Sequence, residues 1–499
     1  MNENPYSRIM KRLSPFLFSV GLLLCVTLPM QSFSADQESY SFRFKINGLT
    51  DSVAYLANYF GAKQYYKDTA EVVDGSFAFE GEGSLPGGIY LVVFGEEKTY
   101  FEFIVSDQNL RMETDRIKVA EEMQVEGSEE NRLFYDYLRF INKRSTKAAA
   151  LRTEIKSLDK SEEAKGKKRL AEAKEELNVI NREVDQYKTQ FMVNNPDMFV
   201  TKVFRASKEP EVPDAPEGLD KKAQQRWQWG WFKNHFWDNI DLSDDRMIRT
   251  PIYHQKLNYY LTKLVVQDPD SLISGAKVVC SKVDGQPELF KYTVHYITNK
   301  YESSKIMCVD KVFAYMAKTY YCTYKATWVD TATADKICER GKVLGNLACR
   351  ETAPNLILQD TSGNWLNLHK IDAEYTLLYF WDSGCGHCKK KTPVLLEYYD
   401  KMKAKGASIE VFAVGTEFEN EDWVKFVEEN DLHWINASDN PTYPNGFRDI
   451  YDIFSTPVLY VLDKDKQIIA KRLDVDQLEE FMENMMQQKK REAEGKQMH

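Results

Sequence analysis

The sequence predicts a multidomain chain: a small antiparallel β sandwich at the N-terminus, a central α-helical domain, and a C-terminal α/β domain. Three observations support this fold class. The length of 499 residues is too great for one hydrophobic core. The spacing of apolar residues changes along the chain, from alternation to helical spacing and then to strands alternating with helices. A content of 43% hydrophobic and 13% aromatic residues is enough to build real cores.

Residues 1–34 have the features of a signal peptide. Three basic residues, Arg8, Lys11 and Arg12, precede the apolar run Phe16–Leu28, and small residues stand just before Ala35. This run is shorter than the roughly 20 residues that a membrane-spanning helix needs. We therefore expect export to the periplasm or cell envelope, and no stable membrane span after cleavage. The net charge of −10 argues against a nucleic-acid partner.

Residues 35–125 have the pattern of short strands. Apolar and polar residues alternate, and Gly, Asp and Asn stand at the breaks, which predicts a small antiparallel sandwich. No cluster of His, Cys or acidic residues with catalytic spacing occurs in this region, so we expect a binding or spacer role. The segments that carry the pattern are YSFRFKING, SVAYLANYF, SFAFEGEG, GIYLVVFG and YFEFIVSD.

Residues 126–347 show helical periodicity. Apolar residues within 129–193 recur at spacings of three and four, which predicts a helical hairpin or a helix that pairs with another chain. We favour the hairpin because the apolar stripe is short. The proline-rich, acidic segment 208–219 predicts a linker. Four tryptophans between Trp227 and Trp237 could form a sugar- or peptide-binding surface, but aromatic residues dominate cores, and we interpret them as a helical core.

Residues 348–490 alternate strands with helices. The continuous apolar runs YTLLYFW and IEVFAVGTE predict buried strands with a helix between them. Two further strands joined by a turn and an amphipathic helix follow. This order predicts an α/β sheet with helices on both faces. Residues 491–499 form a polar tail.

Two cysteines, Cys385 and Cys388, follow the first of these strands and open the helix. A zinc site is disfavoured because it needs four ligands and no second C-x-x-C pair occurs. A purely structural disulfide is an alternative in an oxidising compartment. A cysteine at a helix N-terminus, however, meets free backbone N–H groups and the positive end of the helix dipole, and both favour the thiolate. His387 adds a second positive influence. We therefore predict a reactive thiol at Cys385 and a partner that closes a disulfide at Cys388.

These features resemble the TlpA/ResA-like branch of thioredoxin-fold thiol-disulfide oxidoreductases from the bacterial envelope. The resemblance covers residues from about 351 to 490. The full layout of signal, β domain, helical domain and redox domain resembles a group of exported thioredoxin-like proteins from Gram-negative bacteria, whose two leading domains have no settled function. The Gly-His pair between the cysteines is similar to protein disulfide isomerase. The matching features are F-W-x(3)-C-x-x-C followed by lysine, Pro393 in the helix, and Ser455-Thr456-Pro457 before a strand.

The resemblance implies a role for each residue of the site. It assigns catalytic roles to Cys385, Gly386, His387, Cys388 and Pro457, and substrate contact to Trp381 and Thr456. It also implies a cis peptide bond before Pro457, facing the cysteines. Two positions depart from the family pattern: Tyr379 stands where thioredoxin has Asp, and Lys391 where ResA-like members have Glu. The proton carrier for Cys388 is therefore open between His387, water and Glu397.

We predict a periplasmic thiol-disulfide oxidoreductase that reduces or isomerises protein disulfides through the CGHC motif. Its partners would be protein thiols and disulfides of the envelope and an upstream donor or acceptor of electrons, membrane-bound or soluble. No cofactor or metal is expected beyond the redox-active Cys385–Cys388 disulfide. Two alternatives stay open: a peroxiredoxin-like peroxidase, which the residues before Cys385 do not favour, and an envelope binding protein whose redox domain is secondary.

Five further cysteines follow residue 34: Cys280, Cys308, Cys322, Cys338 and Cys349. Because their number is odd, we expect at least one to stay free or to pair between molecules. Cys338 and Cys349 are close enough in sequence to be bridged. Free thiols are slightly favoured for these two, since Cys338 fits a buried position of a helix.

Overall fold

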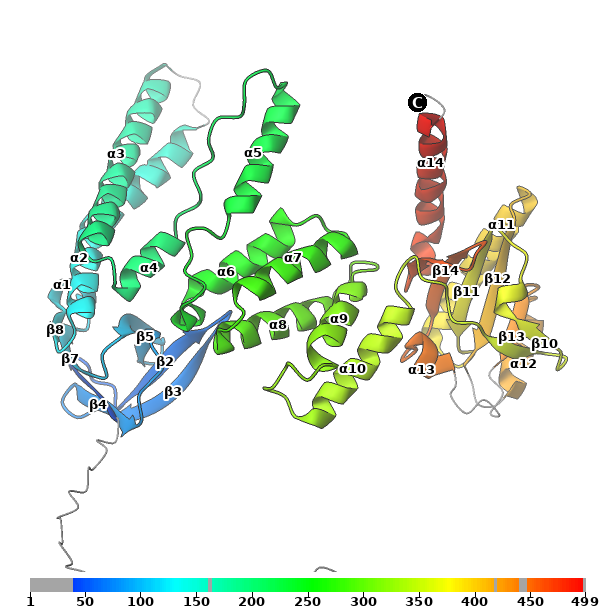
Figure 1. Cartoon of the computed structure of the whole chain (residues 1–499), viewed down its shortest axis with the longest axis horizontal. Coiled ribbons are helices and arrows are strands. Elements are labelled where there is room, and N and C mark those ends of the chain that lie inside the picture. Colours follow the sequence, from blue (N-terminus) through cyan, green and yellow to red (C-terminus); the bar gives the residue numbers. More distant parts are fainter. Residues whose placement is uncertain (1–38, 160–163, 417–419, 439–446, 497–499) are drawn as a thin grey trace, which may run out of the picture.

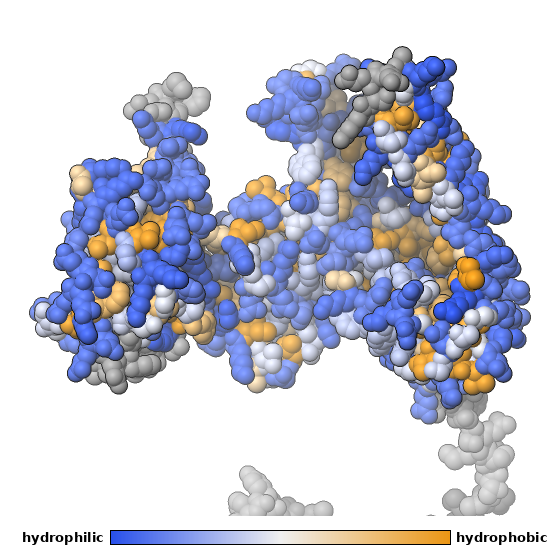
Figure 2. Space-filling model, turned by 180° about the vertical axis from the view of Figure 1, so that it is seen from behind, coloured by the Kyte–Doolittle hydropathy of each residue, from blue (hydrophilic) through white to orange (hydrophobic). Residues whose placement is uncertain are grey.

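The computed structural model describes residues 39–159, 164–416, 420–438 and 447–496. Figure 1 shows β strands at one end of the molecule, helices in the middle and an α/β part at the other end. The predicted multidomain fold class is confirmed. The predicted signal peptide lies outside the described residues. Within those residues, no helix has both the length and the apolar character that crossing a membrane requires. Hydrophilic residues cover most of the face seen in Figure 2.

The N-terminal part consists of two four-stranded sheets packed face to face. Phe44 on β1 contacts Phe101 and Phe103 on β6, with ring centres 6.0 and 5.4 Å apart. The pairing is antiparallel except between β1 and β7, which run parallel. The sheets have the orders β4-β1-β7-β8 and β3-β2-β5-β6. Their elements are β1 (Ser39–Asn47), β2 (Val53–Phe60), β3 (Lys63–Glu71), β4 (Ser76–Glu82), β5 (Gly88–Phe94), β6 (Thr99–Val105), β7 (Asn109–Asp115), β8 (Gln124–Glu126) and the short helix α1 (Val119–Glu122).

Two long helices, α2 (Glu129–Leu158) and α3 (Ala164–Asn194), form an antiparallel hairpin (Figure 1). The Ser128 side chain caps α2 by accepting a hydrogen bond from the backbone N–H of Asn131. The two helices share a small core of their own and are joined by Arg169–Glu154 and Arg144–Glu183 ion pairs. That core consists of Ala148, Leu151, Ala173 and Ile180.

The sandwich and the helices after the hairpin share one hydrophobic core, which extends from Phe42 to Leu344. The backbone N–H of Gly61, after β2, donates to the carbonyl of Ile248 in η1 at 2.9 Å. Buried Asn131 on α2 joins the hairpin to the sandwich as well, because its side chain accepts from the Ile104 N–H and donates to the Ile104 carbonyl, both at 2.7 Å. The two parts therefore form one packed unit. The helices are α4 (Phe199–Ala206), α5 (Lys221–His235), η1 (Asp245–Arg249), α6 (Pro251–Tyr259), η2 (Tyr260–Leu264), α7 (Pro269–Lys282), α8 (Pro287–Glu302), α9 (Asp310–Met316), η3 (Ala317–Tyr321) and α10 (Thr331–Asn346).

The tryptophan-rich segment corrects one prediction. Helix α5 contributes no buried residue, and Trp229 is 48% exposed. In Figure 1, α5 stands apart from the α2–α3 hairpin. Trp237 lies beyond the end of α5 and is buried in the shared core. The expectation of a helical core therefore holds for Trp237 but is wrong for Trp229, because α5 meets the shared core through partly buried side chains such as Phe232 and leaves Trp229 on the surface.

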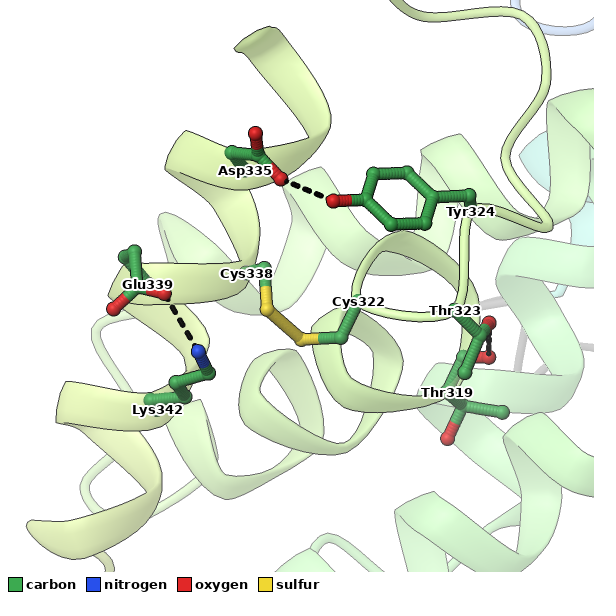
Figure 3. The surroundings of a disulfide bond; sticks show 8 residues. All are labelled: Thr319, Cys322, Thr323, Tyr324, Asp335, Cys338, Glu339 and Lys342. Atoms are coloured by element: carbon green, nitrogen blue, oxygen red, sulfur yellow. Dashed lines mark hydrogen bonds and ion pairs between the residues drawn. A yellow bond between two sulfur atoms is a disulfide. The ribbon is translucent and has the colours of Figure 1, made fainter. Parts of the chain in front are cut away.

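The cysteine pairing also differs from the prediction. Cys338 bonds to Cys322, which ties α10 to the turn after η3 (Figure 3). Cys349 bonds to Cys308, which precedes α9. Both predictions for Cys338 and Cys349, a bridge between them and two free thiols, were wrong. Each cysteine bonds to a partner that is brought near only by the folding of α9 and α10. Cys280 is free and buried, in agreement with the odd number of cysteines.

The C-terminal part is a seven-stranded mixed sheet with the order β10-β9-β13-β12-β11-β14-β15. Strand β11 lies in its interior, between β12 and β14, parallel to β12 and antiparallel to β14. The strands are β9 (Ile357–Asp360), β10 (Trp365–Asn367), β11 (Tyr375–Trp381), β12 (Ile409–Gly415), β13 (Ile435–Ser438), β14 (Val458–Asp463) and β15 (Ile468–Lys471). The helices are η4 (Leu368–Lys370), α11 (Gly386–Ala404), α12 (Asn420–Glu429), α13 (Phe447–Tyr451), η5 (Val475–Gln477) and α14 (Leu478–Lys496).

Alternation along β11 builds two cores, one on each face of the sheet. Tyr379 and Trp381 point into the core that α11, α12 and α14 cover. Leu378 and Phe380 point into the opposite core, which α13 covers. Every residue of β11 is buried, as expected for a central strand packed on both faces. The residue that follows β11 is therefore held on a rigid support.

Candidate active site

The turn between β11 and α11 positions the two cysteines. The Asp382 carboxylate accepts hydrogen bonds from the backbone N–H groups of Gly384 and Cys385, at 2.7 and 3.1 Å. Cys385 is the N-cap residue of α11, and Cys388 lies in its first turn. Asp382 was not among the predicted site residues. Its position before a tight turn is the signal that could have found it, because Asp side chains commonly bond the backbone two residues on.

Cys385 is partly exposed, and its thiol is polarised. The sulfur lies 3.5 Å from the carbonyl oxygen of Thr456, to which the thiol donates. Partial burial raises the pKa of Cys385, but hydrogen bonds from the backbone N–H of Cys388, from the side chains of Thr456 and Cys388 and from the backbone N–H of His387 together outweigh it. The net result is a pKa below that of an ordinary thiol. This is the environment of a thiolate nucleophile.

Cys388 has the opposite environment. Its side chain is completely buried in the core beneath α11. Burial raises the pKa of Cys388 to about 12, although the Asp382 backbone N–H opposes this. Cys388 therefore remains a neutral thiol until something removes its proton.

The other predicted residues lie around this pair. The Thr456–Pro457 peptide bond is cis, as the resemblance implied, and Thr456 contacts Cys385 through its carbonyl. His387 is exposed, and its influence on the Cys385 pKa comes through its backbone N–H. A Cβ atom added to Gly386 would meet nothing within 4 Å, so the surface beside Cys385 is open.

The prediction that Trp381 contacts substrate is corrected by the structure. Its side chain is completely buried, and its ring packs 5.2 Å from that of Phe426 on α12. Trp381 is the last residue of β11, and the alternation along that strand turns it into the core. Its part in the site is to support the turn that carries Cys385.

A buried hydroxyl network lies behind Cys388. The Tyr379 hydroxyl is 3.1 Å from the Thr392 hydroxyl, and either group can donate. Thr392 is one helical turn beyond Cys388 and shares its face of α11. Burial raises the pKa of Tyr379, and the nearby charges of Cys388 and Cys385 add to this. Glu397 is exposed and nine residues beyond Cys388, roughly 13 Å along the helix, so it is badly placed to serve as the proton carrier.

A cavity of about 560 Å³ opens beside the pair. Tyr379, His387 and Pro457 belong to its wall. Lys391 also lines it, and its ammonium group pairs with Asp474 at 2.7 Å and Asp476 at 2.6 Å. The Lys391 that replaces the family's Glu is therefore held in a salt bridge to the segment around η5. A buried thiol, a polarised thiol and an adjoining cavity together define a thioredoxin-type dithiol site.

Comparisons with known proteins agree with this class. Residues 372–468 match the thioredoxin-like family. Residues 40–134 and 156–345 match two domains of unknown function, DUF4369 and DUF5106. Thiol-disulfide oxidoreductase ResA of Bacillus cereus is 32% identical over 136 residues, which cover 27% of this chain and 75% of ResA.

Two solved structures are also similar. A domain of a possible thiol-disulfide isomerase from Cytophaga hutchinsonii is 41% identical and has a TM-score of 0.27, over 28% of this chain and 95% of that domain. A thioredoxin-like protein from Bacteroides caccae is 19% identical with a TM-score of 0.43, over 55% of this chain and 98% of that protein.

The fold and site define a thioredoxin-like enzyme. Through its C-terminal domain, the chain belongs to the thiol-disulfide oxidoreductase family that includes ResA.

Proposed function

We propose that this enzyme reduces or isomerises protein disulfides in the periplasm by attack of the Cys385 thiolate. One observation carries the proposal: a thiol of lowered pKa stands at the N-cap of α11, one turn from a buried thiol whose pKa is about 12. The lowered pKa suits a nucleophile, because more of the thiol is ionised at neutral pH. The raised pKa suits a resolving cysteine, because it stays protonated and unreactive until the mixed disulfide has formed.

The reaction proceeds in two exchanges. Cys385 attacks one sulfur of the substrate disulfide, forms a mixed disulfide and expels the other sulfur as a thiolate, which takes up a proton. Cys388 then loses its proton, attacks the Cys385 sulfur and releases the second substrate thiol. The substrate gains two electrons and two protons, and the enzyme ends with a Cys385–Cys388 disulfide. In isomerisation, a second substrate thiol attacks the substrate sulfur of the mixed disulfide, which forms a different substrate disulfide and releases the Cys385 thiolate, so no net electrons are transferred.

No cofactor beyond the redox-active cysteines is needed for this chemistry. Reduction of further substrate requires a dithiol donor, membrane-bound or soluble, that returns two electrons to the Cys385–Cys388 disulfide. The predicted signal peptide supports location in the envelope. The disulfides Cys308–Cys349 and Cys322–Cys338 support it as well, because such bonds persist in oxidising compartments.

Trapping of the mixed disulfide tests the division of labour. A Cys388→Ala variant expressed in the native envelope should accumulate disulfide-linked substrate proteins, identified by mass spectrometry. The matched Cys385→Ala variant should accumulate few or none, because its remaining thiol is buried and protonated. Equal trapping by both variants would contradict the assignment of nucleophile and resolving cysteine.

The direction of the reaction is tested with the purified full chain. Reductase activity is followed as release of substrate thiols in the presence of dithiothreitol, and isomerase activity as recovery of a protein with scrambled disulfides. If a Cys385→Ala/Cys388→Ala double variant matched the wild type in both assays, the dithiol site would not be responsible for either activity.

A further inference from the structure

A second cavity of about 340 Å³ adjoins the cavity at the active site. Both are lined by Asp452, Arg472 and Leu473. The first cavity contains Phe454 and reaches His387, beside Cys385. The second reaches the segment 302–308, between α8 and α9, and Arg340 on α10. These two adjoining cavities, which we call the groove, therefore extend from His387 and Pro457, beside the cysteine pair, to the central helices.

The helical wall of this groove is fixed to the redox domain. The side chain of Lys471 on β15 is buried and pairs with Asp310 at the start of α9. The same ammonium group donates to the carbonyl of Leu347, just after α10. The Cys308–Cys349 disulfide joins the two helical segments that hold Lys471. Met307 packs against the core that contains Cys388. These contacts therefore fix the position of the helical wall relative to Cys385.

Two large apolar side chains on the groove are exposed. Phe454, three residues before Pro457, is 80% exposed, and Ile306 on the helical wall is 51% exposed. The Arg340 guanidinium lies 5.7 Å from the centre of the Phe454 ring, so α10 and the loop before Pro457 meet here. Single exposed apolar residues are common, but two of this size on opposite domains of one groove indicate a binding surface.

The charges of the groove are largely paired with one another. Arg340 pairs with Glu302, Arg472 with Asp452 and Lys391 with Asp474. Lys471 pairs with Asp310 in the same way. A charged ligand would have to compete with these pairs, whereas an apolar side chain could cover Phe454 and Ile306 without breaking any of them. The occupant that fits is therefore apolar.

We propose that the end of the helical domain forms one wall of the substrate site and selects polypeptides with a large apolar residue next to the reacting cysteine. This inference rests on the proposed oxidoreductase function and deepens it by naming the substrate class. The substrate sulfur meets Cys385, and the flanking residues extend past Phe454 toward Ile306. Only a polypeptide chain, and not a small disulfide, is long enough to reach both domains.

A comparison of two matched peptide substrates tests the proposal. They are short peptides of identical sequence, disulfide-bonded to a fluorescent thiol, with either Leu or Ser on both sides of the cysteine. The full chain is assayed with dithiothreitol as the dithiol donor, and kcat/KM is measured for each peptide. We expect the wild type to prefer the Leu peptide at least fivefold.

Variants of the wall locate the preference. Ile306→Ser should bring the ratio of the two kcat/KM values close to one, and Ile306→Leu should keep the wild-type ratio. Val266→Ser, a matched change of an exposed apolar residue elsewhere in the helical domain, should leave the ratio unchanged. Thermal unfolding of Ile306→Ser and Val266→Ser shows whether either change has disturbed folding. If Ile306→Ser is unstable, Phe454→Ser provides the test, because Phe454 is 80% exposed on the opposite side of the groove and its loss should also lower the ratio.

The outcomes separate this inference from the function on which it rests. If the wild type reduces bis(2-hydroxyethyl) disulfide and both peptides but does not distinguish the peptides, the helical wall has no role in selection while the oxidoreductase function stands. The wall is likewise excluded from selection if Ile306→Ser and Val266→Ser give the same ratio. If none of the three substrates is reduced, the proposed function itself fails.

Discussion

Iodoacetamide added to the reduced chain at pH 7 should alkylate Cys385 roughly 100-fold faster than Cys388. With its pKa raised by burial to about 12, Cys388 is ionised in only ~10⁻⁵ of the molecules, against ~3% for an ordinary cysteine. A thiolate of higher pKa is intrinsically more nucleophilic, so the Cys388 thiolate reacts roughly 40-fold faster than an ordinary one, which partly offsets its low concentration. The ratio of the two rates is therefore close to 100, and the steric cover of Cys388 increases it further.

The assay is timed alkylation between pH 5 and pH 10, with peptide mass spectrometry after quenching. Mild reduction opens the Cys385–Cys388 pair and leaves the two structural disulfides closed. Because the pKa of Cys385 is lowered, its rate should level off at a lower pH than that of a free cysteine peptide. Cys280 provides an internal standard: burial raises its pKa to about 11, which slows it by roughly 20-fold relative to an ordinary cysteine. In urea, all three cysteines should react alike. Comparable rates for Cys385 and Cys388 in the folded chain would refute the reasoning.

Three other predictions follow from the structure. His387→Pro should raise the Cys385 pKa and shift the pair toward a more reducing potential in glutathione equilibria, because proline removes the backbone N–H that stabilises the thiolate. His387→Ala is the control, because it keeps that N–H. An equal shift in both variants would show that the imidazole, and not the backbone, causes the effect. Tyr379→Phe should slow resolution of the mixed disulfide by about tenfold, because the Tyr379 hydroxyl then no longer helps to move the Cys388 proton. Tyr398→Phe is the control and should leave this rate unchanged, because it removes a buried hydroxyl that has no hydrogen-bond partner in the described structure. Replacing Cys308 and Cys349 by Ser should lower the free energy of unfolding by about 4 kcal/mol, and replacing Cys322 and Cys338 by Ser should lower it by about 3 kcal/mol. The first loss is larger because the first disulfide closes a longer segment, with a sequence separation of 41 against 16. Denaturant titration gives both values, and a larger loss for the second pair would contradict the chain-entropy argument.

Local patterns were sufficient for much of the fold and for the centre of the site. The apolar run of β11, the C-G-H-C spacing after it and the helical spacing of α11 are all contained in one short stretch, residues 375–404. A helix N-terminus favours a thiolate wherever it occurs, so the unequal roles of Cys385 and Cys388 followed from their order. The pairing of structural cysteines had no such local rule, and the predictions for Cys338 and Cys349 failed.

The sequence by itself determined the class of each domain and the position of the dithiol, because these depend on periodicity, on residue type and on a motif of neighbouring residues. The cis bond before Pro457 was implied by the resemblance to the family. Tertiary structure alone decided that Trp381 faces inward, that Trp229 on α5 is exposed, and that Cys349 meets Cys308. It also decided that segment 302–308 stands against the redox domain, with Ile306 and Phe454 on one groove. Those facts depend on which distant segments pack together, and packing is set by the sum of many weak contacts rather than by any pattern readable along the chain.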